Sequence, residues 1–179
     1  IETLGANLKS LETKYDASWV TFYDDTYTWP DMKAKKMGKD PLGRVREISR
    51  GIKNKFGNNF NYQVFMRANM IDSDVLTEIA DSGVDCISIG IESGDDEVLR
   101  AVGKGTNQEK ILEAVEKLNK VYKSHGIELR GSFIIGLPKE TPQSLEKTFN
   151  LLKTLPIQIV NVNIATPYPG TKMYDLALE

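Results

Sequence analysis

The sequence predicts an α/β fold in which five parallel strands alternate with helices and form an open or partial barrel. Five short apolar segments have the character of buried strands, and helix-like segments with apolar spacing separate them. Parallel strands joined by helices make right-handed crossovers. A closed eight-stranded barrel needs about 250 residues, whereas this chain has 179.

Composition and charge bound the kind of protein that the sequence encodes. The length suits one domain with a substantial core, and 23 basic against 25 acidic side chains leave a net charge of -2. No broad basic surface favours nucleic-acid binding, so a small-molecule ligand is expected. No apolar run approaches the roughly 20 residues of a membrane span, and no membrane contact is expected.

Cys86 is the only cysteine of the chain. A single thiol excludes an internal disulfide, and it excludes an iron–sulfur site built by this chain alone. This cysteine usage suits a reducing compartment, so a cytoplasmic location is expected. Ile1 stands where an initiator methionine is expected, and the chain is therefore predicted to be a fragment of a longer protein.

A helix and a strand are expected at the start of the chain. Leucines recur at helical spacing within residues 2–13, which predicts an amphipathic helix. Residues 18–23, SWVTFY, predict a buried strand, and the polar segment Asp24-Asp25-Thr26 begins where that strand ends. A long polar connection that contains several lysines follows.

The next helix is expected to begin at Pro41, because proline is favoured at the first helical position and an apolar stripe follows it. Residues 62–66 predict the second strand, and Arg67 stands at its end. Asp72 or Ser73 is expected to cap a short helix after that strand.

Residues 84–91 predict the third strand, and its alternation separates two kinds of side chain. Large apolar side chains face one side, namely Ile87, Ile89 and Ile91. Small or acidic side chains face the other and suit a crowded barrel interior, namely Cys86, Ser88, Gly90 and Glu92. A capping box at Thr106 and Glu109 then predicts a helix that runs to Ser124.

The stretch GIELRGSFIIGLPKETP, residues 126–142, predicts a strand, a tight turn and the start of a helix. Gly136 and Pro138 end the strand, because both residues interrupt regular pairing. Thr141 is expected to cap a helix whose first residue is Pro142.

Residues 157–164 predict the fifth strand, and a helix is expected from Met173 onwards. The carboxyl ends of parallel strands share one edge of a sheet, where βα loops and helix amino termini converge on ligands. The segments expected at that edge are DDT at 24–26, Arg67, ESG at 92–94, GLPKET at 136–141 and PYPGT at 167–171.

This series of strand ends resembles the radical S-adenosylmethionine (SAM) superfamily, most closely its iron–sulfur oxidoreductase and cobalamin-associated branches. The resemblance implies a partial (β/α)6 TIM-like barrel with parallel strands. Residues 1–179 would then form a single barrel domain containing strands two to six, with the first strand and its Cys-x3-Cys-x2-Cys cluster loop missing.

The resemblance also implies which residues contact SAM and which part of it they contact. They are Asp24, Asp25 and Thr26 at the amino group, Arg67 at the carboxylate, Glu92 and Ser93 at the ribose, Ile134, Gly136 and Pro138 at the adenine, and Pro167 and Tyr168 in the turn beside the adenine. Carboxylates accept hydrogen bonds from amino and hydroxyl groups, and an arginine can bind a carboxylate through two donors.

The activity implied by the resemblance needs SAM and a 4Fe-4S cluster, and cobalamin is a possible further cofactor. The superfamily cleaves SAM reductively to a 5'-deoxyadenosyl radical, for hydrogen abstraction or for methyl or sulfur transfer. The substrate of this protein is not identified by the sequence. The chain alone is expected to be inactive, because the cluster ligands are absent from it.

Other readings of the same residues stay open. Asp24, Asp25 and Glu92 would supply oxygen ligands for Mg2+ in a metal-dependent barrel enzyme that acts on a phosphorylated small molecule. A non-catalytic nucleoside-binding module is a further alternative. Arg67 would serve equally well as a structural ion-pair partner of Glu92. Self-association is expected through the exposed sheet edge beside the strand at 18–23.

Overall fold

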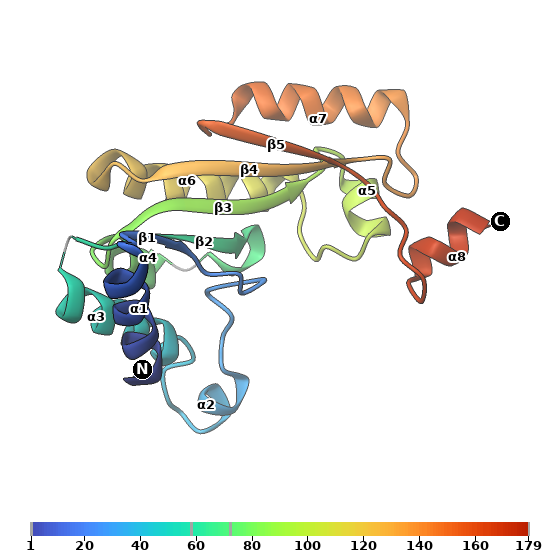
Figure 1. Ribbon diagram of the computed structural model, residues 1–179. Helices are drawn as coiled ribbons and strands as arrows, with labels where there is room; N and C mark the ends of the chain where they lie inside the picture. Colours follow the sequence, from blue (N-terminus) through green and yellow to red (C-terminus); the bar gives the residue numbers. More distant parts are fainter. Residues whose placement is uncertain (1, 58, 72, 179) are drawn as a thin grey trace.

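Five parallel strands form one sheet in the computed structural model, which describes residues 2–57, 59–71 and 73–178 (Figure 1). Their order in the sheet is the order along the chain: β1 (Trp19–Thr21), β2 (Asn61–Arg67), β3 (Val84–Glu92), β4 (Glu128–Ile135) and β5 (Ile159–Ile164). The sheet is an open half-barrel. The prediction of five parallel strands in a partial barrel is therefore confirmed.

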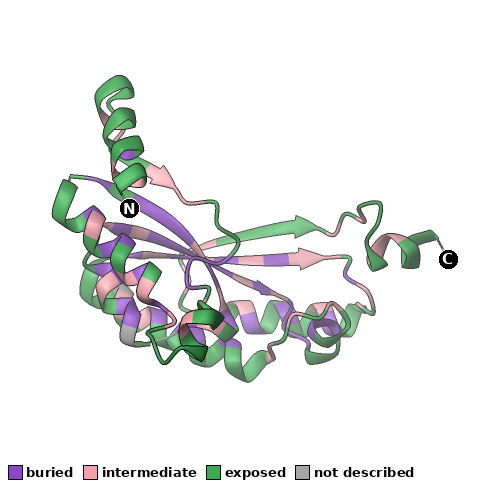
Figure 2. Ribbon diagram, turned by 90° about the horizontal axis from the view of Figure 1, so that it is seen from below, coloured by how far each residue is buried: buried purple, intermediate pink, exposed green. Residues whose placement is uncertain are grey.

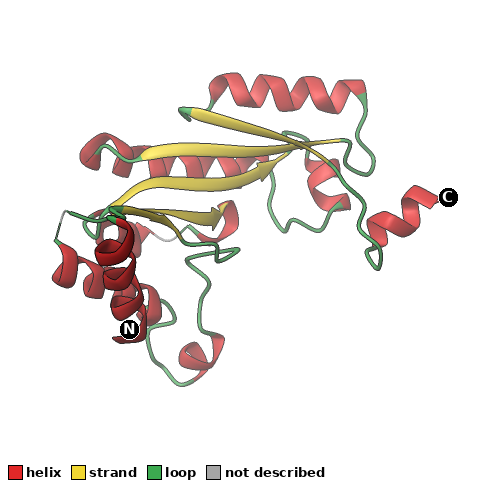
Figure 3. Cartoon of the chain, in the orientation of Figure 1, coloured by secondary structure: helices red, strands yellow, loops and turns green. Residues whose placement is uncertain are grey.

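Helices precede, connect and follow the strands, and the longer connecting helices cover the outer face of the sheet (Figure 3). In chain order they are α1 (Glu2–Tyr15), α2 (Met32–Lys36), α3 (Gly43–Phe56), the 3-10 turn η1 (Ala68–Met70), α4 (Ser73–Ala80), α5 (Asp96–Ala101), α6 (Gln108–His125), α7 (Pro142–Thr154) and α8 (Lys172–Leu178). None of the helices in the described ranges is both long and apolar enough to cross a membrane.

The core lies between the outer face of the sheet and these helices. Tyr62, Val64 and Met66 of β2 and Ile87, Ile89 and Ile91 of β3 are almost fully buried there. Burial of apolar surface is the main driving force for this packing. In Figure 2 buried residues concentrate in the central strands, whereas β5 is largely exposed. The predicted alternation of β3 is confirmed.

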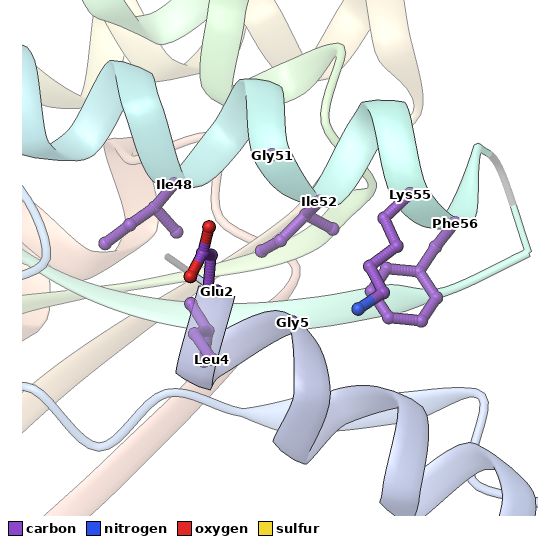
Figure 4. A pocket seen from close by; sticks show the side chains of 8 residues that line it. All are labelled: Glu2, Leu4, Gly5, Ile48, Gly51, Ile52, Lys55 and Phe56. Carbon is purple, nitrogen blue, oxygen red and sulfur yellow. The ribbon is translucent and has the colours of Figure 1, made fainter.

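Helix α1 packs across α3, which provides the partner surface that its leucines need. Leu8 is buried, and Leu4 lines an apolar pocket of about 230 Å³ with Ile48 and Ile52 of α3 (Figure 4). Gly5 of α1 lies against the Lys55 side chain of α3, because a Cβ on Gly5 would lie 3.1 Å from Lys55 Nζ.

Two short helices lie in segments to which the sequence analysis assigned no helix. The Asp31 carboxylate accepts hydrogen bonds from the amides of Lys33 and Ala34 and so starts α2. The Asp95 carboxylate starts α5 in the same way. Helices of five and six residues show no apolar period, so their capping residues are the only local signal.

The expected start of α6 was wrong by one residue. Asn107, and not Thr106, caps this helix, because its side-chain oxygen accepts the Lys110 amide at 3.0 Å. The Thr106 hydroxyl is buried without a partner among the described residues. Helix α3 likewise begins at Gly43 and not at Pro41. The cap proposed at Asp72 lies outside the described residues.

The turn after β4 follows the prediction closely. Thr141 and Ser144 form a reciprocal capping box, and Pro142 is the first residue of α7. Gly136 has φ +88 and Lys139 has φ +66, a region that favours glycine. The chain therefore turns sharply between β4 and α7.

One edge of the sheet is open along β1. This strand pairs with β2 on one side, and no described strand pairs with its other side. Unpaired parallel edges are ready templates for association. Self-association through this edge stays a prediction.

Gly94, which follows β3, packs directly against the backbone of α7. Its amide donates to Thr148 Oγ1 at 2.9 Å, and a Cβ added to it would lie 2.7 Å from Thr148 Cα. No side-chain rotation relieves a contact with backbone atoms.

We therefore expect Gly94→Ala to lower the free energy of unfolding by about 1–3 kcal/mol, measured by urea denaturation. Gly43→Ala is the matched control, because its added Cβ meets only Asp40 Cβ at 3.9 Å. Equal stability of the two variants would contradict the tight packing of this loop on α7.

Candidate functional site

The inner face of the sheet carries side chains in rows that the strand register defines. Residues paired across neighbouring parallel strands project to the same side. One row comprises Phe65, Ser88, Arg130 and Ile159. The next row, nearer the carboxyl edge, comprises Arg67, Gly90, Ser132 and Asn161.

A cavity of about 200 Å³ opens on these two rows. Three residues that the sequence analysis assigned to a site line it, namely Asp25, Arg67 and Glu92. Side chains that it did not assign also line it, namely Phe65, Ser88, Lys104, Arg130, Ser132 and Asn161. The cavity therefore joins residues of β2, β3, β4 and β5 with Asp25, which follows β1.

An ion pair between Glu92 and Lys104 forms the wall of the cavity at the end of β3. The side chains are only 14% and 18% exposed, respectively. Glu92 adopts φ +68, an uncommon conformation for a residue with a side chain. A Cβ on Gly90 would lie 2.8 Å from both charged groups, so a side chain at that position would make the ends of the pair shift.

Arg67 completes this cluster without pairing with Glu92. Its Nη2 donates to the Lys104 carbonyl oxygen at 3.0 Å, and its Nε is buried with no partner in the described part of the chain. The idea that Arg67 is the ion-pair partner of Glu92 was thus wrong, because Lys104 holds that place. Arg67 keeps an unused donor.

The residues of the polar segment after β1 lie in different surroundings. Asp25 lines the cavity, whereas Asp24 faces Arg44 of α3 at 3.4 Å. Thr26 is buried, and its hydroxyl donates to the Asp25 carbonyl oxygen at 2.7 Å. Of the three, only Asp25 shares the cavity with Arg67 and Glu92.

Ser93 belongs to a polar network that lies behind the end of β3, between this strand end and α7. Its hydroxyl lies 3.2 Å from Thr148 Oγ1 and accepts the Asp95 amide at 3.1 Å. Asp95 in turn pairs with Lys147 at 2.7 Å. The hydrogen bond from Lys147, with those from the Glu97 and Val98 amides, holds the pKa of the Asp95 carboxyl below its usual range. The network ties the end of β3 to α7.

The residues assigned to adenine lie outside the small cavity. The Gly136 amide donates to Glu140 Oε2 at 2.5 Å, and Tyr168 is 68% exposed. Pro138 lines a larger hollow of about 1,110 Å³ between α5 and α8. Ile134 and Pro167 are half-buried. An adenine role for these residues, including Gly136 and Tyr168, stays a prediction.

The sequence analysis missed several residues of the cavity. Lys104 lies in the loop Gly103-Lys104-Gly105, where both glycines have positive φ and shape the turn. That glycine-flanked lysine was the available signal. Arg130 and Ser132 alternate with buried residues along β4, so extending the alternation back from Ile134 places them on the inner face.

The described residues offer no metal centre. Cys86 is buried on β3, and burial raises the pKa of its thiol to about 12. Within residues 2–57, 59–71 and 73–178, no group of three or more His, Cys, Asp or Glu side chains could hold an ion. Asp24, Asp25 and Glu92 in particular do not converge. These residues do not fit a 4Fe-4S cluster.

Comparisons of the sequence and of the structure with known proteins agree with one another. The family described as the Radical SAM superfamily matches residues 33–152. An uncharacterized methyltransferase of Pyrococcus horikoshii is 32% identical over 99% of this chain and 35% of its own length. A putative methylthiotransferase of Methanocaldococcus jannaschii is 36% identical over 64% of this chain and 24% of its own length. The chain spans about a third or less of these relatives.

Solved structures share the fold. The radical SAM methyltransferase TsrM from Kitasatospora setae, solved with cobalamin and a 4Fe-4S cluster, superposes with a TM-score of 0.71 at 16% identity. That match covers 94% of this chain and 29% of TsrM. The cobalamin-dependent radical SAM enzyme OxsB has a TM-score of 0.71 at 19% identity, covering 97% of this chain and 24% of OxsB.

The Glu92–Lys104 pair allows a test of the cavity wall. In a double-mutant cycle with Glu92→Gln and Lys104→Met, we expect a coupling energy of about 1–3 kcal/mol, because the pair is shielded from water. The exposed pair Glu116–Lys120 serves as the control and should give about 0.3–0.5 kcal/mol. Equal coupling in both cycles, measured by chemical denaturation, would mean that Glu92 and Lys104 are not held together.

Asp95 gives a prediction for the pH dependence of stability. Because its pKa is lowered in the folded protein, the ionised carboxylate stabilises the fold at pH values above its unfolded pKa. That contribution is lost as the pH falls through the folded pKa. Asp95→Asn keeps a capping oxygen but removes the charge, so it should cost about 1 kcal/mol at pH 7.

The difference between wild type and Asp95→Asn should begin to shrink below about pH 4, near the unfolded pKa of an aspartate, and should be lost as the pH falls through the lower folded pKa. Urea denaturation at several pH values measures it, with the exposed Asp175→Asn on α8 as the control. A difference that persists unchanged at pH 3 would rule out a charge effect.

Proposed function

This chain belongs to the radical SAM superfamily, and we propose that it is the SAM-binding part of an iron–sulfur enzyme of the methyltransferase or methylthiotransferase branch. The observation that carries this function is the convergence of Asp25, Arg67 and Glu92 on one cavity at the carboxyl edge of the sheet. Parallel α/β folds bind their ligands at that edge. The names of the two relatives support the choice of branch.

The free hydrogen-bonding groups of the cavity suit the polar groups of SAM. The unpartnered Nε of Arg67 is a donor for the methionine carboxylate. The exposed carboxylate of Asp25 is an acceptor for the amino group. Lys104 binds Oε1 of Glu92 and leaves Oε2 to accept from a ribose hydroxyl. We assign these three residues to SAM on that basis.

Lys104 has a positioning role in this scheme. Its ammonium group binds the Glu92 carboxylate and fixes the direction of that side chain. The absence of a side chain at Gly90 leaves room for both charged ends. Arg67 is held in turn by the Lys104 carbonyl oxygen, so the three side chains are oriented together.

The cofactors that the family implies are SAM and a 4Fe-4S cluster, and the structural neighbours TsrM and OxsB, solved with cobalamin bound, support cobalamin as a third. When bound, they supply reductive cleavage of SAM to a 5'-deoxyadenosyl radical, for hydrogen abstraction or for methyl or sulfur transfer to a substrate. We place the cluster ligands outside this chain, because its single buried thiol does not fit them. The chain itself binds and orients SAM.

The direct test uses the full-length protein, purified and reconstituted without oxygen. We expect iron and sulfide in cluster stoichiometry and conversion of SAM to 5'-deoxyadenosine on addition of dithionite. Glu92→Gln should weaken SAM binding in equilibrium dialysis about tenfold, as expected for loss of one charge-assisted hydrogen bond.

Glu116→Gln on the exposed face of α6 is the control and should bind SAM as the wild type does. Binding of adenosine without a cluster would favour the nucleoside-binding module instead. A metal-dependent activity on a phosphorylated compound, with SAM left intact, would favour the metal-dependent barrel enzyme. Either result overturns the proposed function.

A further inference from the structure

The inner face of the sheet carries a second polar level that the proposed SAM contacts leave unused. The row Phe65, Ser88 and Arg130 lies two residues below Arg67, Gly90 and Ser132 along each strand. At about 3.3 Å per residue, the two rows are about 7 Å apart. The deeper row combines an aromatic ring, a hydroxyl and a guanidinium group in the same cavity.

Arg130 is fixed in place but retains free donors. Its Nε donates to Glu128 Oε1 at 2.7 Å, and this hydrogen bond raises the pKa of the guanidinium. No other described residue accepts a hydrogen bond from Arg130, so its Nη groups are available. The side chain is 31% exposed and lines the cavity. A guanidinium held in this way presents N–H donors in one plane, and these match two oxygens of a carboxylate or phosphate.

Ser88 and Phe65 lie beside the Arg130 guanidinium on the inner face of the sheet. Gln63 Nε2 donates to Ser88 Oγ at 2.7 Å, and no described residue accepts the Ser88 hydroxyl proton. Phe65 lies beside Ser88 in the register, and its ring is 5.9 Å from the ring of Tyr23. One wall of the deeper level is therefore aromatic, and the opposite side donates hydrogen bonds.

We infer that Phe65, Ser88 and Arg130 form a subsite for an anionic group of the substrate, a carboxylate or phosphate attached to an apolar or planar body. On the premise of the proposed function, the substrate enters the half-barrel below SAM and is oriented by this charge. The cavity, at about 200 Å³, is smaller than the roughly 300–1,000 Å³ of pockets for drug-sized ligands. It thus accommodates one group of a larger ligand.

The charge balance of the cavity supports the same ligand class. Glu128 occupies only the Nε side of Arg130, and no described carboxylate forms an ion pair with its Nη groups, although Asp85 lies near enough to act on the guanidinium electrostatically. An apolar substrate group would leave those donors without an acceptor, which is unfavourable in a partly buried site, and a neutral acceptor would form a weaker hydrogen bond than an anion does. Phe65 adds a hydrophobic contact that a small inorganic anion would not use.

The test compares benzoate with its neutral isostere benzamide as probes of the full-length protein. Saturation-transfer NMR titrations at one fixed ionic strength measure both dissociation constants. We expect benzoate to bind about tenfold more tightly than benzamide to the wild type. In Arg130→Gln the two probes should bind equally.

Arg50→Gln on α3 is the matched control, because Arg50 is also paired with a carboxylate, donating from Nη2 to Glu78 Oε1 at 3.1 Å, and does not line the cavity. It should retain the preference for benzoate. Phe65→Leu should weaken both probes alike, which keeps the subsite testable if Arg130→Gln does not fold. Equal binding of the two probes to the wild type, or an unchanged preference in Arg130→Gln, would overturn the subsite.

The methionine carboxylate of SAM is the other possible source of this anion. Titration of benzoate in the presence of saturating SAM, without reductant, separates the two. Simultaneous binding supports a substrate subsite, whereas displacement of benzoate by SAM overturns it. Because these titrations need no cleavage of SAM, an inactive protein would count against the proposed function and leave the subsite to be judged by the probes.

Discussion

The alternation of side chains along β3 is the constraint on which both faces of the sheet depend. Ile87, Ile89 and Ile91 are buried against the helices, and each contributes roughly 2 kcal/mol of hydrophobic stabilisation. The residues between them are small, so Ser88 and Gly90 leave the cavity open on the inner face. A register slip of one residue would exchange the two faces and bury Glu92 in the core. Packing and binding are thus determined by one strand.

The end of β3 is strained locally and supported from two sides. The register against β4 shifts between Gly90 and Glu92, and Glu92 takes up a left-handed conformation. On the inner face Lys104 pairs with this carboxylate. On the outer side the segment Ser93-Gly94-Asp95 is bound to α7 by hydrogen bonds and an ion pair. Such support is what an unfavourable backbone conformation at a binding site requires.

Much of the fold was predictable, because its signals are local. Short apolar runs predicted the five strands, and Thr141 as a cap followed by Pro142 predicted the start of α7. The wrong or missing details have physical causes. Thr106 and Asn107 are adjacent and both are good capping residues, and Asn107 caps the helix. Helix α5, with six residues, is too short to show the apolar periodicity of a helix in its sequence.

The site was predictable only in part. Asp25, Arg67 and Glu92 could be assigned because each stands directly at a strand end. Lys104 could not, since it reaches Glu92 from a loop 12 residues further along the chain. The resulting cavity carries both signs of charge, with Arg67 and Lys104 opposite Asp25 and Glu92. Two carboxylates would repel a purely anionic ligand, and two cations would repel a purely cationic one. A zwitterion such as the methionine part of SAM satisfies both, whereas Arg130, one level deeper, selects a negative group alone.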